Sequence, residues 1–209
     1  YRSNFVLFGL PLTVSVFGDV ASSVAAMVVT VVITIYNTTS VVILEMFNSE
    51  GKTDVKTILV NVVKNPLLQG AMVGLVFFFL GIHVPKSLLT PIAAFADATS
   101  PVALFVLGGT LHFNAIRGNL KYLVPALSLK LLVLPAVMLA LGYAFGLRDL
   151  ELFLLVAIYG TPVAAASYPM AQNMGGDGEL AGQFVVISTV VAVGTLFGWI
   201  FFMKSVGLI

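Results

Sequence analysis

Two copies of one short motif, aromatic-Gly-x-Pro, interrupt long apolar stretches of the chain: Phe8-Gly9-Leu10-Pro11 and Tyr159-Gly160-Thr161-Pro162. Proline has no N–H and clashes with the carbonyl four residues before it, so each proline opens the hydrogen-bond ladder of a helix. Glycine tolerates the backbone angles that result. In apolar surroundings the freed N–H and C=O groups must line a cavity or meet protein, and N–H groups at a helix end bind anions. The motifs therefore predict an anion site around Gly9, Pro11, Gly160 and Pro162, the alternative being two simple proline kinks.

Polar side chains beside the two motifs are the candidates for holding a carboxylate. Asn4 offers an amide donor just ahead of the first motif. Thr161 and Ser167 flank the second break with hydroxyl groups, and Asn37 stands in a polar cluster of the second apolar stretch. Interhelical hydrogen bonding is the alternative role for each of them. We predict that Asn4, Asn37, Thr161 and Ser167 bind the substrate.

Asp97 and Lys130 are the charged residues expected near mid-membrane depth. They lie about nine and about ten residues inside their apolar stretches, and a helix rises about 1.5 Å per residue. A lone charge at that depth costs at least about 2.5–3.5 kcal/mol, so such residues pair or line a polar pathway. We expect the two to face each other across adjacent helices or to share a cavity. They then form either a static ion pair or an ion-coupling pair in which Asp97 carries a proton.

The residue inventory excludes several kinds of site. The chain has no cysteine, so it holds no disulfide, thiolate nucleophile or Cys-based metal site. Its two histidines, His83 and His112, are predicted at span ends near opposite faces, which argues against a shared metal. The sequence has no HExxH or GxSxG motif, and no basic run that would suggest nucleic acid. We predict no catalytic residue, no metal and no cofactor; an intramembrane enzyme or a structural membrane protein is the alternative from another functional class.

The segments that carry these residues are long and continuously apolar. Hydrophobic residues make up 59% of the 209 and charged residues 9%, against about 25% charged in soluble domains. With so little charge the chain cannot cover a water-facing surface, so lipid is its predicted surrounding. Continuous runs predict helices rather than the short alternating strands of a membrane barrel. We predict an all-α membrane protein of about seven spans, at about 4–17, 20–46, 56–82, 88–112, 120–146, 150–173 and 180–204.

The loops between these spans indicate the orientation in the membrane. Lys and Arg favour cytoplasmic loops. The larger set of basic residues lies in alternate loops, at Lys52, Lys56, Lys64, Arg117 and Lys121, and the smaller set on the other side, at Lys86, Arg148 and Lys204. This distribution predicts that the C-terminus lies outside the cell.

The two motif-bearing segments occupy corresponding places in two similar units. In each, a Gly-Asp pair (Gly18-Asp19 or Gly176-Asp177) follows the motif ahead of one more long span. The first unit is predicted to run outward and the second inward. Such an arrangement characterises inverted-repeat secondary transporters, whose discontinuous helices meet near the midplane. We predict residues 1–47 as the end of a first repeat, 48–55 as a cytoplasmic linker, and 56–209 as a second repeat of five spans broken near Pro162.

Several motifs resemble one known family. The stretch SNFVLFGLPL (residues 3–12) resembles the broken fourth helix of the auxin efflux carrier family, whose hallmark Asn stands seven residues before the Pro, as Asn4 does here. Lys64-Asn65-Pro66-Leu67 also matches. Thr161-Pro162, Pro169-Met170-Ala171-Gln172 and Gly175-Gly176-Asp177 look like the ninth helix and the loop after it. The family includes plant auxin exporters and bacterial permeases for malonate, malate and similar carboxylates, and the short 48–54 linker is closer to the bacterial members.

The resemblance implies ten helices in two groups of five and a homodimer. This chain, which opens at Tyr1 inside an apolar run, would then cover the fourth to the tenth helix. The expected function is secondary transport of a small organic anion, auxin-like or a dicarboxylate such as malonate or malate, by alternating access in a bacterial inner membrane. A sodium-coupled transporter like the bile-acid symporters is the alternative with the same crossed helices. Proton and sodium coupling are both open.

Overall fold

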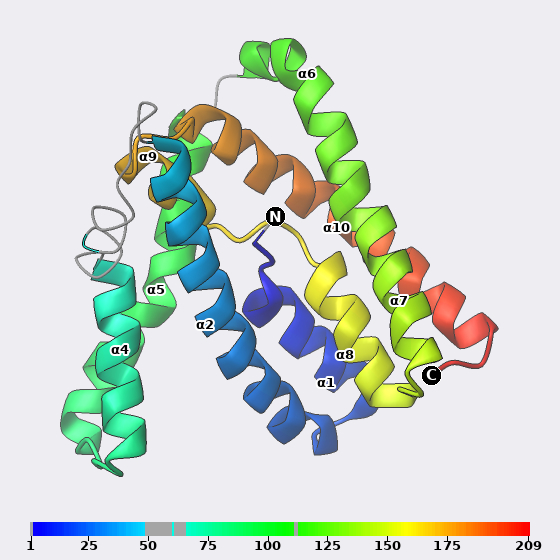
Figure 1. Cartoon of the computed structure of the whole chain (residues 1–209), viewed down its shortest axis with the longest axis horizontal. Helices are drawn as coiled ribbons and strands as arrows, with labels where there is room; N and C mark the ends of the chain where they lie inside the picture. The colour runs from blue at the N-terminus through cyan, green and yellow to red at the C-terminus, as the bar shows by residue number, and fades with distance from the viewer. Residues whose placement is uncertain (1, 49–59, 61–65, 111–112) are drawn as a thin grey trace.

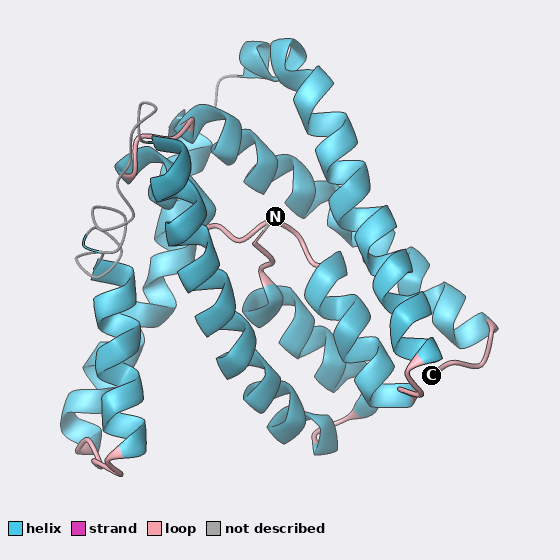
Figure 2. Cartoon of the chain, viewed as in Figure 1, coloured by secondary structure: helices cyan, strands magenta, loops and turns pink. Residues whose placement is uncertain are grey.

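A computed structural model describes residues 2–48, 60, 66–110 and 113–209. This part of the chain forms helices joined by turns and by two extended stretches of backbone, and it contains no β-strand (Figure 1, Figure 2). In chain order the elements are η1 (Phe5–Gly9, a π-helix), α1 (Leu10–Phe17), α2 (Val20–Asn48), α4 (Pro66–Phe79), α5 (Lys86–Thr110), α6 (Phe113–Ser128), η2 (Leu129–Val133, a π-helix), α7 (Leu134–Ala144), α8 (Asp149–Gly160), α9 (Ser167–Asn173) and α10 (Gly178–Ser205).

The predicted segments correspond to these helices. The fifth predicted span begins earlier than expected, at Phe113, and runs from α6 through η2 into α7 without interruption. The sixth is broken between Gly160 and Ser167, as its proline motif predicts. Residues 56–59, 61–65 and 111–112 of the third and fourth predicted spans lie outside the described residues.

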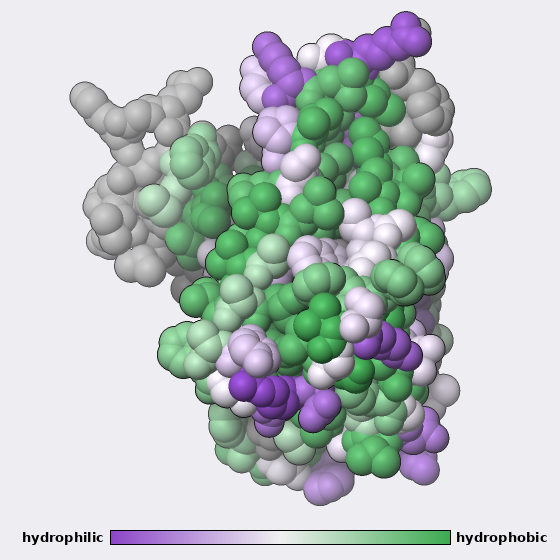
Figure 3. All heavy atoms as spheres, turned by 90° about the vertical axis from the view of Figure 1, so that its right-hand side faces the viewer, coloured by the Kyte–Doolittle hydropathy of each residue, from purple (hydrophilic) through white to green (hydrophobic). Residues whose placement is uncertain are grey.

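The helices have the length and the surface of membrane spans. Four of them are long and apolar enough to cross a bilayer, over Val20–Leu44, Lys86–Gly109, Ile116–Ala144 and Gly178–Ser205. Large apolar side chains face outward, among them Phe95 and Phe105, which are 81% and 85% exposed. Figure 3 shows hydrophobic residues over most of one face, with hydrophilic ones gathered toward its two ends. The prediction of an all-α membrane protein is confirmed.

The two predicted Gly-Asp pairs both lie where one helix ends and another begins, but they work differently. Gly18 ends α1 with a positive φ of 76° and donates its N–H to Val14 O, a backbone shape that favours glycine. Asp177 begins α10 as an N-cap, since its carboxylate accepts the N–H of Leu180 at 2.8 Å. The pattern correctly located both helix boundaries.

The packing separates the helices into a central group and a hairpin at the side. α1 packs on α2 and α8, α7 packs on α8, and α10 contacts α6, α8 and α9. A core cluster that includes Phe5, Leu152, Phe153 and Met203 joins α8 to its neighbours. The α4–α5 hairpin lies at the edge of the molecule, where α4 contacts α2 and α5 contacts α9 (Figure 1). Most predicted site residues therefore fall within the central group.

Candidate functional site

Two extended stretches of backbone meet in the middle of the central group: residues 2–4, which lead into η1, and residues 161–164, the first part of the connection from α8 to α9 (Figure 1). They pair in antiparallel fashion. Asn4 N–H donates to Pro162 O at 2.7 Å, and Ala164 N–H donates to Arg2 O at 2.8 Å. The two segments that the proline motifs predict to be broken therefore meet here, at a place we call the crossing.

Pro162 explains why α8 stops at the crossing. The residue before a proline is driven to extended backbone, and Thr161 has φ −70° and ψ 154°. In a continuing helix the Tyr159 carbonyl would accept the N–H of Val163. That N–H instead donates to Ser188 Oγ on α10 at 2.9 Å. The C-terminal carbonyls of α8 are thus left to find other donors inside the protein.

The first break has a matching local cause. Pro11 lacks an N–H, and ahead of it the backbone widens into the π-helix η1, in which Leu10 N–H donates to Phe5 O. Gly9 is required there because an added Cβ would stand 2.1 Å from Cδ2 of the buried Phe5 ring. Thr13 Oγ1 donates to Gly9 O at 2.6 Å and fixes the turn that follows.

Asn4 stands at the N-terminal end of η1, half-buried at the crossing. Its side chain makes no capping hydrogen bond. The first N–H groups of a helix have no acceptor within the helix and carry partial positive charge. Asn4 and the start of η1 together can therefore offer an amide and backbone N–H groups to a carboxylate.

Lys130 extends from η2 into the crossing and is 4% exposed. Its ammonium donates to Ser3 Oγ at 2.5 Å, to Thr161 O at 3.0 Å and to Tyr159 O. Ser3 also forms a hydrogen bond with the Tyr36 side chain on α2. One cation thus contacts both extended stretches, and it takes up carbonyls that the break at Pro162 set free.

The local backbone around Lys130 repeats the geometry of the first break. A Leu-Pro pair follows each π-helix directly, Leu10-Pro11 after η1 and Leu134-Pro135 after η2. Because Pro135 has no N–H, the carbonyl of Leu131 lacks its α-helical donor. The Trp199 indole N–H on α10 donates to that carbonyl at 3.0 Å. α10 therefore stabilises the irregular turn that presents Lys130.

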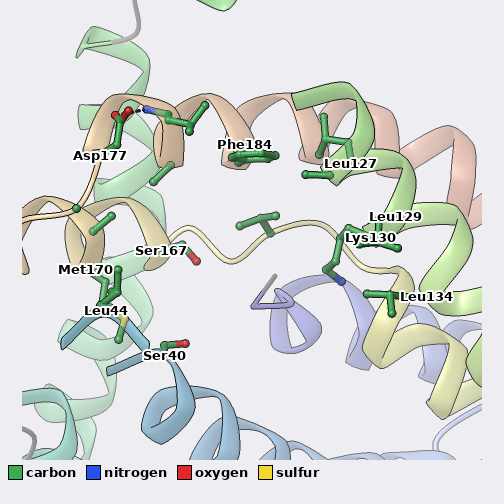
Figure 4. Close-up of a pocket in the computed structure, with 16 residues that line it drawn as sticks. Ser40, Leu44, Leu127, Leu129, Lys130, Leu134, Ser167, Met170, Asp177 and Phe184 are labelled. Carbon is green, nitrogen blue, oxygen red and sulfur yellow. Dashed lines mark hydrogen bonds between the residues drawn. The ribbon is translucent and has the colours of Figure 1, made fainter. Parts of the chain in front are cut away.

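A cavity of about 440 Å³ lies beside the crossing, between α2, the α6–η2–α7 helix, residues 161–166, α9 and α10. Figure 4 shows the side chains around it; the Lys130 stem runs along the wall, and its nitrogen points toward the N-terminal segment. Most lining residues are apolar. The polar or charged ones are Ser40, Lys130, Ser167 and Asp177.

Several buried polar atoms near this region have no hydrogen-bond partner among the described residues. They include Ser40 Oγ, Asn37 Oδ1 and Thr161 Oγ1. Ser40 is 2% exposed and Thr161 0%. Buried polar groups are nearly always paired, so unpaired ones mark places where a ligand or water binds. Ser40 lines the cavity and lies one helical turn from Asn37.

The structure places the predicted substrate-binding residues at or near the crossing. Asn4, Thr161 and Pro162 belong to it, and Gly160 is the last residue of α8. Ser167 begins α9 and lines the cavity. Asn37 lies on the adjacent α2, while Gly9 and exposed Pro11 shape the first helix beyond the crossing. Their role in binding stays a prediction.

The predicted contact between Asp97 and Lys130 is not formed. Asp97 is exposed on α5, in the hairpin at the edge of the molecule, whereas Lys130 is buried in the crossing with Ser3 and two backbone carbonyls as acceptors. The sequence predicts a similar membrane depth for both residues, but depth says nothing of the direction in which a side chain leaves its helix. A proton-carrying role for Asp97 stays a prediction.

Sequence reasoning missed Ser3, Ser40 and Trp199. Ser40 stands three residues after Asn37, a spacing that places both on one face of a helix. Trp199 lies in the last predicted span, and its indole N–H donates inside the protein, to Leu131 O. The Leu134-Pro135 pair, which repeats Leu10-Pro11, was the available signal for a second irregular turn. Across the described ranges, the structure brings together no group of three His, Cys, Asp or Glu side chains that could hold a metal ion.

Comparisons with known proteins agree with this picture. A family model described as "membrane transport protein" matches residues 2–200. A protein of Rhizobium meliloti (strain 1021) named "Putative malonate transporter" is 29% identical over 147 residues, which are 68% of this chain and 44% of the relative. The matched part thus corresponds to less than half of that relative.

Proposed function

The chain belongs to the membrane transport protein family, and we propose that it carries a small organic carboxylate across the membrane through the crossing of its two broken segments. This is the family that the motifs around Pro11 and Pro162 resemble. The observation that carries the proposal is the crossing itself, with a cavity of about 440 Å³ beside it. Irregular backbone inside a membrane is tolerated where it lines a cavity, and transporters bind their substrates at such broken helices.

Three features of the crossing are proposed to bind the anion. The Asn4 amide makes no capping bond, so it can donate to a carboxylate oxygen. The first N–H groups of η1 add partial positive charge at the same place. The Lys130 ammonium adds a full positive charge, and its contacts named above are to neutral oxygen atoms. A carboxylate at the crossing therefore finds donors and an attractive potential.

The cavity lining favours a carboxylate with an apolar body. Leucine, valine, methionine and phenylalanine side chains dominate the wall, and the Ser40 and Ser167 hydroxyls supply neutral donors. The Asp177 carboxylate at the α10 end would repel a second negative charge. A dianion such as malonate would have to leave one charged group in this apolar wall, which is costly. A monocarboxylate of the auxin type matches the lining better.

The predicted orientation of the chain indicates which face of the membrane the cavity lies closer to. Its lining residues lie toward the C-terminal end of α2 and the start of α10, next to the loops predicted to be cytoplasmic. We propose that, in the conformation of this structure, the cavity lies in the cytoplasmic half of the membrane. An anion bound there leaves a cell that is negative inside with a gain of about 2.3 kcal/mol per charge and 100 mV.

Alternating access requires one part of the molecule to move against another. The paired stretches of the crossing and Lys130 join α1, α8, α9 and η2. The α4–α5 hairpin contacts this group mainly through α2 and α9. We propose that the joined helices rock as one body against the hairpin.

The test is transport into proteoliposomes with two probes, malonate and phenylacetate. We expect uptake of phenylacetate at lower KM than malonate. Asn4→Ala removes a hydrogen bond to a charged group, worth about 1.5–3 kcal/mol, so KM should rise about ten- to hundredfold. Asn173→Ala is the matched control, since Asn173 is exposed at the end of α9. If Asn4→Ala transports with the KM of the wild type, the proposed site is wrong; if neither probe is transported, the proposed substrate class is wrong.

A further inference from the structure

We propose that the Lys130 ammonium is a tethered cation. It permanently fills the place at the crossing that an exchangeable monovalent cation would otherwise occupy, so the crossing is held together without bound sodium. The inference rests on the geometry of the crossing and, for its consequence in transport, on the proposed function.

The first argument is the match between donors and acceptors. A lysine ammonium has three N–H donors and no acceptor. At the crossing it meets three oxygen atoms: Ser3 Oγ from the N-terminal stretch, and the Tyr159 and Thr161 carbonyls from the second broken segment. The charge is therefore coordinated from both sides of the crossing, as a small bound cation would be.

The second argument concerns the acceptors. The last carbonyls of a helix carry partial negative charge and need donors. Tyr159 O loses its helical donor because Val163 N–H bonds Ser188 Oγ instead. In transporters with discontinuous helices, unwound carbonyls and helix C-terminal ends of this kind coordinate Na⁺. Here a side chain of the protein takes that position.

The third argument is burial. Lys130 is 4% exposed, and a long charged side chain that could reach the membrane surface normally does so. Lys130 instead turns its ammonium inward, and the irregular turn that carries it is stabilised by the Trp199 hydrogen bond to Leu131 O. The backbone is thus arranged to deliver this charge to the crossing.

Chemical rescue tests the inference directly. Lys130→Ala removes three carbons and the ammonium group, which together correspond to n-propylammonium. We expect the thermal midpoint of the full chain carrying Lys130→Ala to fall in detergent, and n-propylammonium to raise it saturably, by about 3–6 °C at ten times its dissociation constant. The neutral analogue n-propanol and the bulky cation choline should not do so.

Lys121→Ala is the matched control, because Lys121 lies on α6 of the same continuous helix but is exposed, with its ammonium over the Tyr122 ring. Equal effects of n-propylammonium on Lys130→Ala and Lys121→Ala would overturn the inference. If Lys130→Ala does not fold, the wild type decides: its midpoint should be the same in sodium chloride and choline chloride at equal ionic strength, and a sodium-specific stabilisation refutes the tethered cation.

The outcome is separable from that of the proposed function. Rescue by n-propylammonium is read from unfolding and needs no substrate. A protein that shows rescue but transports neither probe keeps the tethered cation and loses the proposed substrate. A protein that transports phenylacetate only in the presence of sodium keeps the carboxylate and loses the tethered cation.

Discussion

The hydrogen bond between Trp199 and Leu131 O predicts a specific energetic coupling between two helices. Trp199→Phe keeps an aromatic ring against Phe202, with which Trp199 makes an edge contact, but removes the indole donor. Leu131 is buried, and its carbonyl has no α-helical donor because residue 135 is proline. Leaving a buried acceptor unpaired costs about 1–3 kcal/mol. A hydrogen bond between membrane helices contributes about 0.6–2 kcal/mol of stability. We expect a loss of about 1–2 kcal/mol.

The diagnostic comparison is the same substitution in a Pro135→Ala background. Alanine at 135 restores an N–H that can reach Leu131 O, so Trp199→Phe should then cost much less. Pro135→Ala has its own cost because the ring packs near Gly160, but a double-mutant cycle removes that common term. The predicted coupling energy is about 1 kcal/mol or more.

Far-UV circular dichroism is the suitable assay, because the chain has a single tryptophan and the variant has no tryptophan fluorescence. For a protein of this size the single variant should melt about 2–8 °C below the wild type. If the unfolding free-energy changes of Trp199→Phe and Pro135→Ala add to within about 0.3–0.5 kcal/mol in the double variant, the explanation of the irregular turn at η2 is refuted.

Three further predictions follow from single residues. Gly9→Ala places a Cβ 2.1 Å from the Phe5 ring and should lower the free energy of unfolding by about 1–3 kcal/mol. Gly194→Ala, in open space on α10, should not destabilise the protein, and equal effects of the two substitutions would contradict the packing argument. Ser40→Ala should raise the KM of carboxylate transport and leave the melting temperature unchanged, because Ser40 Oγ has no partner in the described part of the protein; an unchanged KM contradicts it. If Asp97 carries a proton, Asp97→Asn removes the pH dependence of transport, and an unaltered pH profile rules that role out.

The broken helices could be predicted from the sequence because proline acts locally. Pro162 determines the conformation of Thr161 and removes one donor, whatever surrounds it. The meeting of the two breaks could also be expected. Their segments are predicted to run in opposite directions through the membrane, and each break is predicted near the midplane. Hydropathy alone was enough to identify the spans, since it reflects the lipid on their outer face.

The contacts of Lys130 could not be predicted in the same way. Counting residues gives the height of Lys130 in the membrane, and at that height an acid on another span looked like the natural partner. The real acceptors are backbone carbonyls and Ser3, which carry no charge and leave no trace in a charge pattern. The π-helix at η2 also changes the angle at which Lys130 leaves the helix, which an ideal period of 3.6 residues does not anticipate.

The crossing also has a consequence for how the protein is made. Ser3 and Lys130 are separated by 127 residues, so the first extended stretch is synthesised long before its partners. At about 5–20 residues per second, roughly 6–25 s pass before Lys130 follows Ser3 out of the ribosome. During that time the start of η1 stands in the translocation machinery or the lipid without the backbone pairing that later joins Asn4 to Pro162. Biogenesis of this protein therefore depends on holding an unfinished helix end until the last third of the chain arrives, and substitutions at Ser3 or Lys130 should lower the yield of inserted protein.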